Sequence, residues 1–135
     1  MTQNFPGNET DAAPLADDCE VYRAILKPRF YDKRSSQILF GAFLRRPQDV
    51  SGLSVYLKRL RTIESICQQF NLAAVGSLSV GGVRSISVGP ELDVIQKGAD
   101  PAHANITGLP VNGNDEILAN KLAFELARRC RVEFP

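Results

Sequence analysis

The order in which β-type runs and helical stripes follow one another is the feature that most constrains this fold. Several short runs rich in branched and aromatic residues surround only two stretches with helical periodicity, so strands and helices do not alternate regularly. This order favours an α+β domain with a mainly antiparallel sheet and helices packed on one side of it. At 135 residues the chain is long enough to bury a core of its own. We therefore expect a flexible acidic tail over residues 1–18 and a single α+β domain over residues 19–135.

The two helices are predicted from apolar residues that recur at intervals of three and four. They cover residues 58–70, with Leu60, Ile63 and Ile66 on the apolar stripe, and residues 115–130, with Leu122 and Leu126 on theirs. The β-type runs predict strands at residues 20–27, 38–43, 53–57, 72–80, 83–88, 92–96 and 102–107.

Two of these predicted strands depend on glycines. Both alternating sets of residues in 38–43 are apolar, which is typical of a central strand, and Gly41 within it indicates a bulge or a close approach. Gly81 and Gly82 separate two β-type runs, so they predict a tight hairpin. A helical turn over residues 81–86 is the alternative, and the sequence does not decide between the two.

Charge is distributed unevenly although the net charge is only +1. Residues 1–20 hold five acids and no base, whereas residues 21–61 hold ten bases and two acids, a net of +8. A basic third beside an acidic tail predicts a polyanionic or protein partner, or a tail that covers the basic residues.

The sequence also argues against several classes of protein. No apolar run approaches the roughly 18 residues of a membrane span, and the first 20 residues carry neither a base nor an apolar block, so we expect a cytoplasmic protein with no membrane partner. Three separated cysteines predict free thiols rather than disulfides, and a single histidine excludes a multi-histidine metal site. No nucleotide fingerprint or nucleophile elbow is present, so no cofactor is expected.

Two residues are candidate catalytic groups. His103 follows a turn and begins a predicted strand, where a general acid or base is well placed, although such a histidine also commonly bonds a backbone carbonyl. Arg23 is the one charge inside an apolar strand, so it is either buried with a partner, which is an internal carboxylate or an anionic ligand, or it points to solvent.

Further polar residues are candidate binding groups because they flank the predicted strands of residues 34–57. Hydroxyls and guanidinium groups bind phosphate, and aromatic residues accompany them here as in a stacking platform. Serine is also the ordinary residue of turns. The candidate binding residues are Arg34, Ser35, Ser36, Arg45, Arg46 and Ser54.

Four short motifs, YRxI, SSxxxFxAF, GLSV and PAHAxIxG, span residues 21–110 in this order. In them the chain resembles a family of small bacterial proteins to which no activity is attached. The resemblance implies that the polar members of these motifs belong to one site, and a small toxin-like transferase or nuclease would use such a set. Those members are Arg23, Ser35, Ser36, Ser54 and His103.

Two hypotheses about function follow. The first is a small binding or accessory module that contacts a polyanionic or protein partner through residues 21–61. The alternative is a small enzyme that acts on a nucleotide or RNA, with His103 as acid or base and Arg23 as the group that holds the anion.

Overall fold

The computed structural model describes residues 14–111 and 113–135, whose strands form a six-stranded antiparallel sheet in the order β6-β7-β4-β1-β5-β8. The sheet strands are β1 (Glu20–Ile25), β4 (Leu53–Leu57), β5 (Ala74–Ser79), β6 (Asp93–Gln96), β7 (His103–Thr107) and β8 (Arg131–Phe134). A separate hairpin pairs β2 (Tyr31–Asp32) with β3 (Gln37–Ile38). The helices are α1 (Ile63–Gln69), α2 (Val80–Arg84) and α3 (Glu116–Arg129), and the 3-10 helices are η2 (Pro28–Phe30) and η3 (Phe40–Phe43). The predicted α+β class is confirmed.

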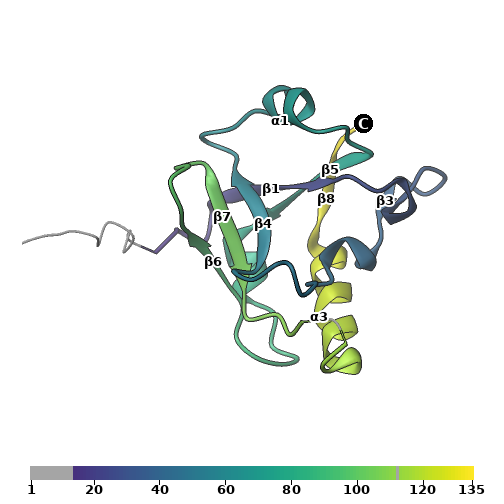
Figure 1. The fold of residues 1–135 in the computed structure, drawn as a ribbon, viewed down its shortest axis with the longest axis vertical. Coiled ribbons are helices and arrows are strands. Elements are labelled where there is room, and N and C mark those ends of the chain that lie inside the picture. The colour runs from purple at the N-terminus through teal and green to yellow at the C-terminus, as the bar shows by residue number, and fades with distance from the viewer. Residues whose placement is uncertain (1–13, 112) are drawn as a thin grey trace, which may run out of the picture.

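The helices cover both faces of the sheet, not one face as predicted (Figure 1). On one face the buried side chains of α2, α3 and η3 pack with alternate residues of the strands, among them Val55 and Leu122. On the other face Ile66 of α1 packs on Tyr22, Tyr56 and Val75. Because successive strand residues point to opposite faces, these two clusters use opposite sets of strand residues. Two of the functional candidates, Ser54 and His103, lie on this second face.

Most of the predicted strands and both predicted helices are confirmed, with shifted ends. The first helix begins at Ile63 instead of residue 58, because the Thr62 hydroxyl caps it by accepting a hydrogen bond from the Ser65 amide at 3.1 Å. Strand β8 was not predicted, since it follows α3 directly and its four residues include two charges. Within the described ranges, no helix is both long and apolar enough to cross a bilayer.

The predicted central strand over residues 38–43 is wrong. Only Gln37–Ile38 pair as a strand, and Phe40–Phe43 form a 3-10 helix against α3. The tight turn places Ala42 and Phe43 in the core and leaves Phe40 39% exposed at its edge. A β-carbon on Gly41 would lie 2.5 Å from the ring of Phe30, so the expected close approach at this glycine is present.

The predicted hairpin at Gly81 and Gly82 is also wrong, and the helical alternative is the one observed. The hydroxyl of Ser79 caps α2 by accepting a hydrogen bond from the Gly82 amide at 2.9 Å. The Gly81 amide donates to the carbonyl of Asp17 at 2.8 Å, and a β-carbon at Gly81 would crowd that residue. Small residues are needed here for close approach rather than for a left-handed turn.

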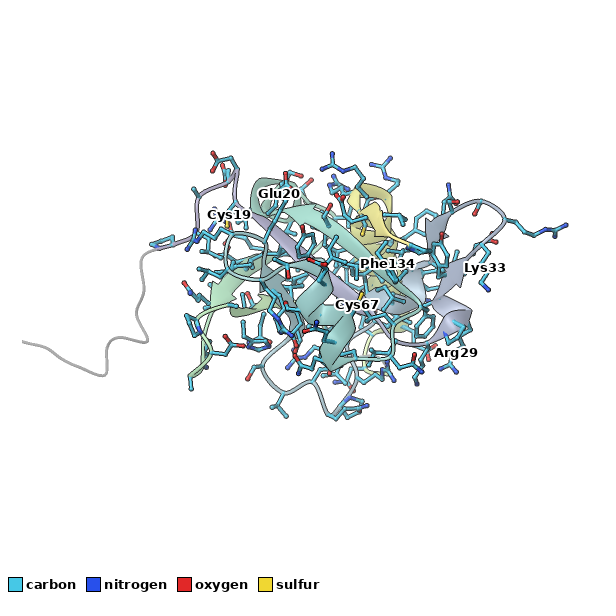
Figure 2. All side chains as sticks on the ribbon, turned by 90° about the horizontal axis from the view of Figure 1, so that it is seen from above. Cys19, Glu20, Arg29, Lys33, Cys67 and Phe134 are labelled. Atoms are coloured by element: carbon cyan, nitrogen blue, oxygen red, sulfur yellow. The ribbon has the colours of Figure 1, made fainter. Side chains whose placement is uncertain are left out.

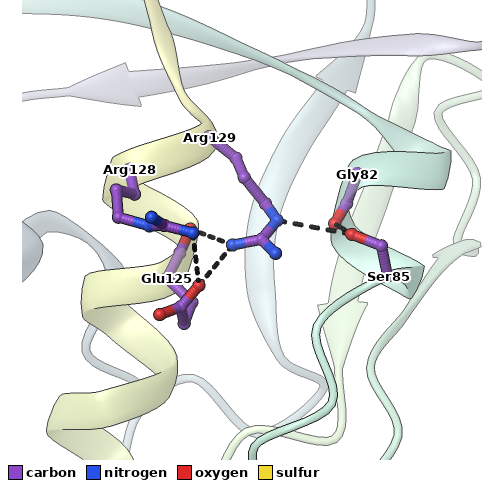
Figure 3. Close-up of polar contacts among 5 residues, drawn as sticks. All are labelled: Gly82, Ser85, Glu125, Arg128 and Arg129. Carbon is purple, nitrogen blue, oxygen red and sulfur yellow. Dashed lines mark hydrogen bonds and ion pairs between the residues drawn. The ribbon is translucent and has the colours of Figure 1, made fainter.

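Helices α2 and α3 are joined by Arg129 (Figure 3). Its guanidinium donates to the hydroxyl of Ser85 at 3.3 Å and to the carboxylate of Glu125 at 2.5 Å. The Ser85 hydroxyl donates in turn to the Gly82 carbonyl at 2.7 Å. The hydrogen bond from Arg129 lowers the pKa of Glu125, so this carboxylate is charged at neutral pH. These contacts fix the C-terminal helix against the short glycine-rich one.

The predicted tail is described only from residue 14 onward, and residues 1–13 lie outside the described residues. Leu15 is 6% exposed and belongs to the main core. Asp17 pairs with Arg84 at 2.8 Å, and Arg84 also pairs with Asp93 at 2.8 Å. Both acids raise the pKa of Arg84. The segment just before β1 therefore packs against the domain.

The three cysteines are free thiols and are partly buried. Cys130 contacts Gly76, where a β-carbon would overlap its sulfur atom. Burial raises the pKa of the Cys130 thiol to about 12. Since the thiolate is the nucleophile, we expect iodoacetamide to alkylate Cys130 about a thousandfold more slowly in the native protein than in the unfolded chain. Peptide mapping after timed alkylation, with and without urea, measures both rates, and equal rates would contradict this prediction.

Candidate functional site

Neighbouring strands place four polar and aromatic side chains on the second sheet face. Ser54 of β4 lies directly opposite Asn105 of β7, and Tyr56 lies opposite His103. Residues two apart on a strand share a face, so all four project from the same side. Three of them, Ser54, His103 and Asn105, line a cleft with a volume of about 390 Å³, whose walls are the loop of residues 48–52 and Lys97 of the β6–β7 turn. We name it the Ser54–His103 cleft.

Ser54 and His103 are hydrogen-bonded within the cleft. The distance between the Ser54 hydroxyl oxygen and His103 Nε2 is 3.1 Å, and the other ring nitrogen lies 3.5 Å from the carbonyl oxygen of Lys97. When Nδ1 carries the proton and donates it to that carbonyl, Nε2 is left to accept from the serine. The ring of Tyr56 packs on His103 edge-on, with centroids 5.8 Å apart. The histidine is thus oriented from two sides.

Asn105 is the most enclosed polar group of the cleft. It is 5% exposed, yet its side-chain amide makes no hydrogen bond to any group in the described part of the chain. Buried polar groups are nearly always paired, because leaving one unpaired costs about 1–3 kcal/mol. The amide faces the cleft beside Ser54. A group that enters the cleft therefore finds a donor and an acceptor that have no other partner.

Arg23 does not belong to this cleft, because its position on β1 directs it to the opposite face from Ser54 and His103. The β1–β4 ladder has only two residue pairs, Val21 with Leu57 and Tyr22 with Tyr56. Beyond them the guanidinium of Arg23 donates to the carbonyl of Ser54 at 2.8 Å and to that of Ala42 at 3.2 and 2.9 Å. It supplies hydrogen bonds where the ladder has ended.

The environment of Arg23 is that of an enclosed cation. The residue as a whole is partly exposed, but its guanidinium lies among protein atoms. Burial lowers the pKa of Arg23 to about 10, so the group is still charged at neutral pH. It also lines a second hollow of about 270 Å³, together with Lys27, Arg46 and Asp49.

Arg45 has a structural part in the loop that borders the cleft. Its guanidinium donates to the carbonyls of Asp49, Val50 and Leu109 at 2.8 to 2.9 Å. The carboxylate of Asp49 in turn accepts a hydrogen bond from the backbone amide of Arg46 at 2.9 Å. These bonds hold residues 45–50 in place, and they leave Arg45 few donors for a ligand.

The bases of residues 21–61 do not form a single surface. Lys58 pairs with Glu20 at 3.4 Å, and Arg59 contacts Cys19, toward one end of the molecule. Figure 2 shows Arg29 and Lys33 at the other end, away from Cys19 and Glu20. Arg61 is held by Ser65 and Gln69 and lies over the ring of Tyr56 at 4.7 Å.

Five of these bases remain without a side-chain hydrogen bond or ion pair to the described residues. We call them the basic end. Two follow β1, two lie in the turn between β2 and β3, and one lies in the loop after η3. They are Lys27, Arg29, Lys33, Arg34 and Arg46.

Ser35 and Ser36 lie in the turn between β2 and β3, away from His103 on β7 (Figure 1). The Ser35 hydroxyl donates to the carboxylate of Asp32 at 2.9 Å, and this bond is the main cause of the lowered pKa of Asp32. Ser36 adopts a left-handed conformation with φ of 56°. The structure thus brings Ser54 and His103 together, places Arg23 behind them on the other face, and keeps Ser35 and Ser36 apart.

Sequence analysis missed Asn105 and the Lys97 carbonyl. Asn105 could have been predicted from the sequence. It follows His103 by two residues and alternates with the apolar Ala104 and Ile106, which predicts that Asn105 and His103 share one face of a strand. The Lys97 carbonyl could not have been predicted, since every residue has a backbone carbonyl and the residue type does not distinguish it. Among the described residues, no group of three or more histidine, cysteine or acidic side chains could hold a metal ion.

Comparisons with protein-family models, with curated proteins and with solved structures find no match to this chain. The candidate site is therefore described by its own geometry alone.

Proposed function

We propose that this protein is a small binding module that contacts nucleic acid through the basic end. The supporting observation is that five bases, Lys27, Arg29, Lys33, Arg34 and Arg46, are not paired to protein carboxylates in the described part of the chain, and that Figure 2 shows Arg29 and Lys33 at the same end of the molecule. Folded proteins usually separate or neutralise like charges, because their repulsion opposes the compact state. A polyanion would neutralise this cluster.

Lys27 and Arg46 are neighbours within the basic end. Both line the hollow above Arg23, and the charge of Arg46, followed by that of Arg29, lowers the pKa of Lys27. This shift shows that the cations are close enough to repel one another. A phosphate between them would replace that repulsion by attraction.

Aromatic surface accompanies the charge, which favours nucleic acid over a folded acidic protein. The guanidinium of Arg29 lies over the ring of Phe30, 4.9 Å from its centre, and Tyr31 follows directly. Both rings are partly exposed. Single-stranded nucleic acid is bound by such a combination, because its phosphates contact cations while its bases stack on aromatic rings.

The experiment compares two double variants of equal charge. Lys27→Glu/Arg46→Glu changes the basic end, and Arg59→Glu/Lys121→Glu makes the same charge change at exposed positions elsewhere. We expect the first to weaken binding of a single-stranded oligonucleotide longer than about 16 nucleotides by roughly tenfold or more. Its salt slope should fall by about 1.4, since each lost phosphate contact to a single strand contributes about 0.7. Fluorescence anisotropy at about 50 mM and about 200 mM salt measures both quantities.

Equal losses in the two double variants would show that binding depends on net charge and not on the basic end. Capture of one protein from a host extract, insensitive to salt and abolished by Lys27→Glu/Arg46→Glu, would replace nucleic acid by a protein partner. Absence of oligonucleotide binding by the unmodified protein at low salt would overturn the proposal.

A further inference from the structure

We propose that the Ser54–His103 cleft is a nucleophilic site that cleaves small carboxylic esters, with Ser54 as nucleophile, His103 as general base and Asn105 as the group that stabilises the oxyanion. This activity does not rest on nucleic-acid binding, because the basic end and the cleft use different side chains. Three features of the cleft carry the inference: the serine–histidine hydrogen bond, the orientation of the imidazole, and the unpaired buried amide.

The first feature is the pairing of an exposed hydroxyl with an imidazole nitrogen. Ser54 is exposed to the cleft, and its oxygen lies 3.1 Å from His103 Nε2. A serine hydroxyl is a weak nucleophile unless a base takes its proton during attack. The distance is within hydrogen-bonding reach, so the proton can pass directly from the serine to the imidazole.

The second feature is the group that orients the base. In many serine hydrolases a carboxylate accepts a hydrogen bond from the Nδ1–H of the histidine. Here the Lys97 carbonyl takes that position at 3.5 Å, a long contact of the kind that tightens when substrate binds. The ring of Tyr56 forms an edge-to-face pair with the imidazole and holds it from another direction. The carbonyl selects the tautomer in which Nε2 accepts from Ser54.

The third feature is Asn105, the independent sign that a ligand belongs in this cleft. Asn105 is 5% exposed, and its side-chain amide has no hydrogen-bond partner among the described residues. It lies directly opposite Ser54 in the β4–β7 pairing. Opposite residues in an antiparallel pair have β-carbons about 5 Å apart. An amide at that distance can donate to the carbonyl oxygen of a substrate that Ser54 attacks.

The cleft limits the substrate to a small molecule. Its volume of about 390 Å³ is at the lower end of the range for ligand pockets. Gly52 closes one side, because its φ of 121° lays the loop directly on the backbone of Ile106, where a β-carbon would overlap the carbonyl. Val50, another lining residue, is 79% exposed.

The reaction is balanced by the residues present, the ester and water. The Ser54 oxygen bonds to the ester carbonyl carbon while its proton passes to His103 Nε2, and Asn105 donates to the oxyanion that forms. The bond to the leaving alkoxide then breaks, and the alkoxide takes the proton from His103 and departs as the alcohol. Water repeats both steps on the acyl-serine, which releases the carboxylic acid and restores the Ser54 hydroxyl.

A fluorophosphonate tests the nucleophile without knowledge of the natural ester, because the activated serine displaces fluoride from phosphorus and keeps the phosphonyl group. We expect Ser54 to be labelled about a hundredfold faster than Ser51, an exposed serine that lines the same cleft and has no hydrogen bond to His103 in the described part of the chain. Mass spectrometry of peptides from the intact chain locates and times the label.

Variants separate chemistry from folding. Ser54→Ala should abolish labelling at this position, and His103→Gln should slow it about a hundredfold or more. Asn105→Ala should slow hydrolysis of p-nitrophenyl acetate by roughly the same factor while Ser54 remains exposed and is still labelled. Circular dichroism and urea unfolding confirm that each variant is folded. Labelling of Ser54 at the rate of Ser51, or an unchanged rate in folded His103→Gln, overturns the proposal.

Discussion

Phe43→Ala should lower the free energy of unfolding by about 4 kcal/mol, the largest loss of stability that we expect from one substitution. The ring of Phe43 is completely buried and belongs to the main core. It is carried by η3, which packs against α3, so its removal leaves a cavity between the 3-10 helix and the C-terminal helix. Equilibrium unfolding in urea, followed by circular dichroism, measures the change.

Phe40→Ala is the matched control, because Phe40 is the same residue type in the same 3-10 helix. Phe40 is 39% exposed, and its ring forms an edge-to-face pair with that of Phe124, with centroids 6.3 Å apart. We expect a loss of about 1 kcal/mol, in line with an exposed aromatic pair. If residues 38–43 formed the central strand that their apolar content predicts, Phe40 and Phe43 would lie on opposite faces that are both buried, and the two substitutions would have similar effects.

The comparison of these two phenylalanines also shows where reasoning from sequence stops. Alternation identifies β1, β4, β5, β6 and β7, since each has neighbouring strands to hold it extended. Residues 38–43 have the same apolar content, but only Ile38 finds a strand partner, in β2. The rest of the segment buries its side chains by turning against α3. An apolar run predicts burial reliably, while its shape depends on which surface is available.

For the candidate site, too, the sequence indicates suitable residue types but not how they are arranged in space. Ser54 and His103 could be proposed from sequence, and the antiparallel order β7-β4-β1 then places them on one face. Ser35 and Ser36 have equally suggestive side chains, yet a short hairpin uses Ser35 for a local hydrogen bond to Asp32. Nothing in the sequence separates these cases, because strand order depends on contacts between distant segments.

Arg23→Ala should lower the free energy of unfolding by about 2 kcal/mol, the second largest effect that we expect. The substitution removes the hydrogen bonds to the Ala42 and Ser54 carbonyls, which have no other side-chain donor within the described residues. Those bonds from a charged donor would contribute more than 2 kcal/mol together. Part of the loss is offset, because burial of the guanidinium, which lowers its pKa to about 10, is itself unfavourable.

Two further variants show whether Arg23 holds the sheet together or holds a ligand. Arg23→Lys keeps the charge, but one ammonium group cannot span both carbonyls, so most of the loss should remain. Arg34→Ala removes an arginine whose guanidinium makes no hydrogen bond in the described part of the chain, and it should change stability by less than about 0.5 kcal/mol. Urea unfolding gives the three stabilities, and fluorescence anisotropy gives the affinity of the folded variants for the oligonucleotide. A stable Arg23→Ala that no longer binds would assign Arg23 to a ligand, because an arginine that only closes the β1–β4 ladder changes stability and leaves affinity intact.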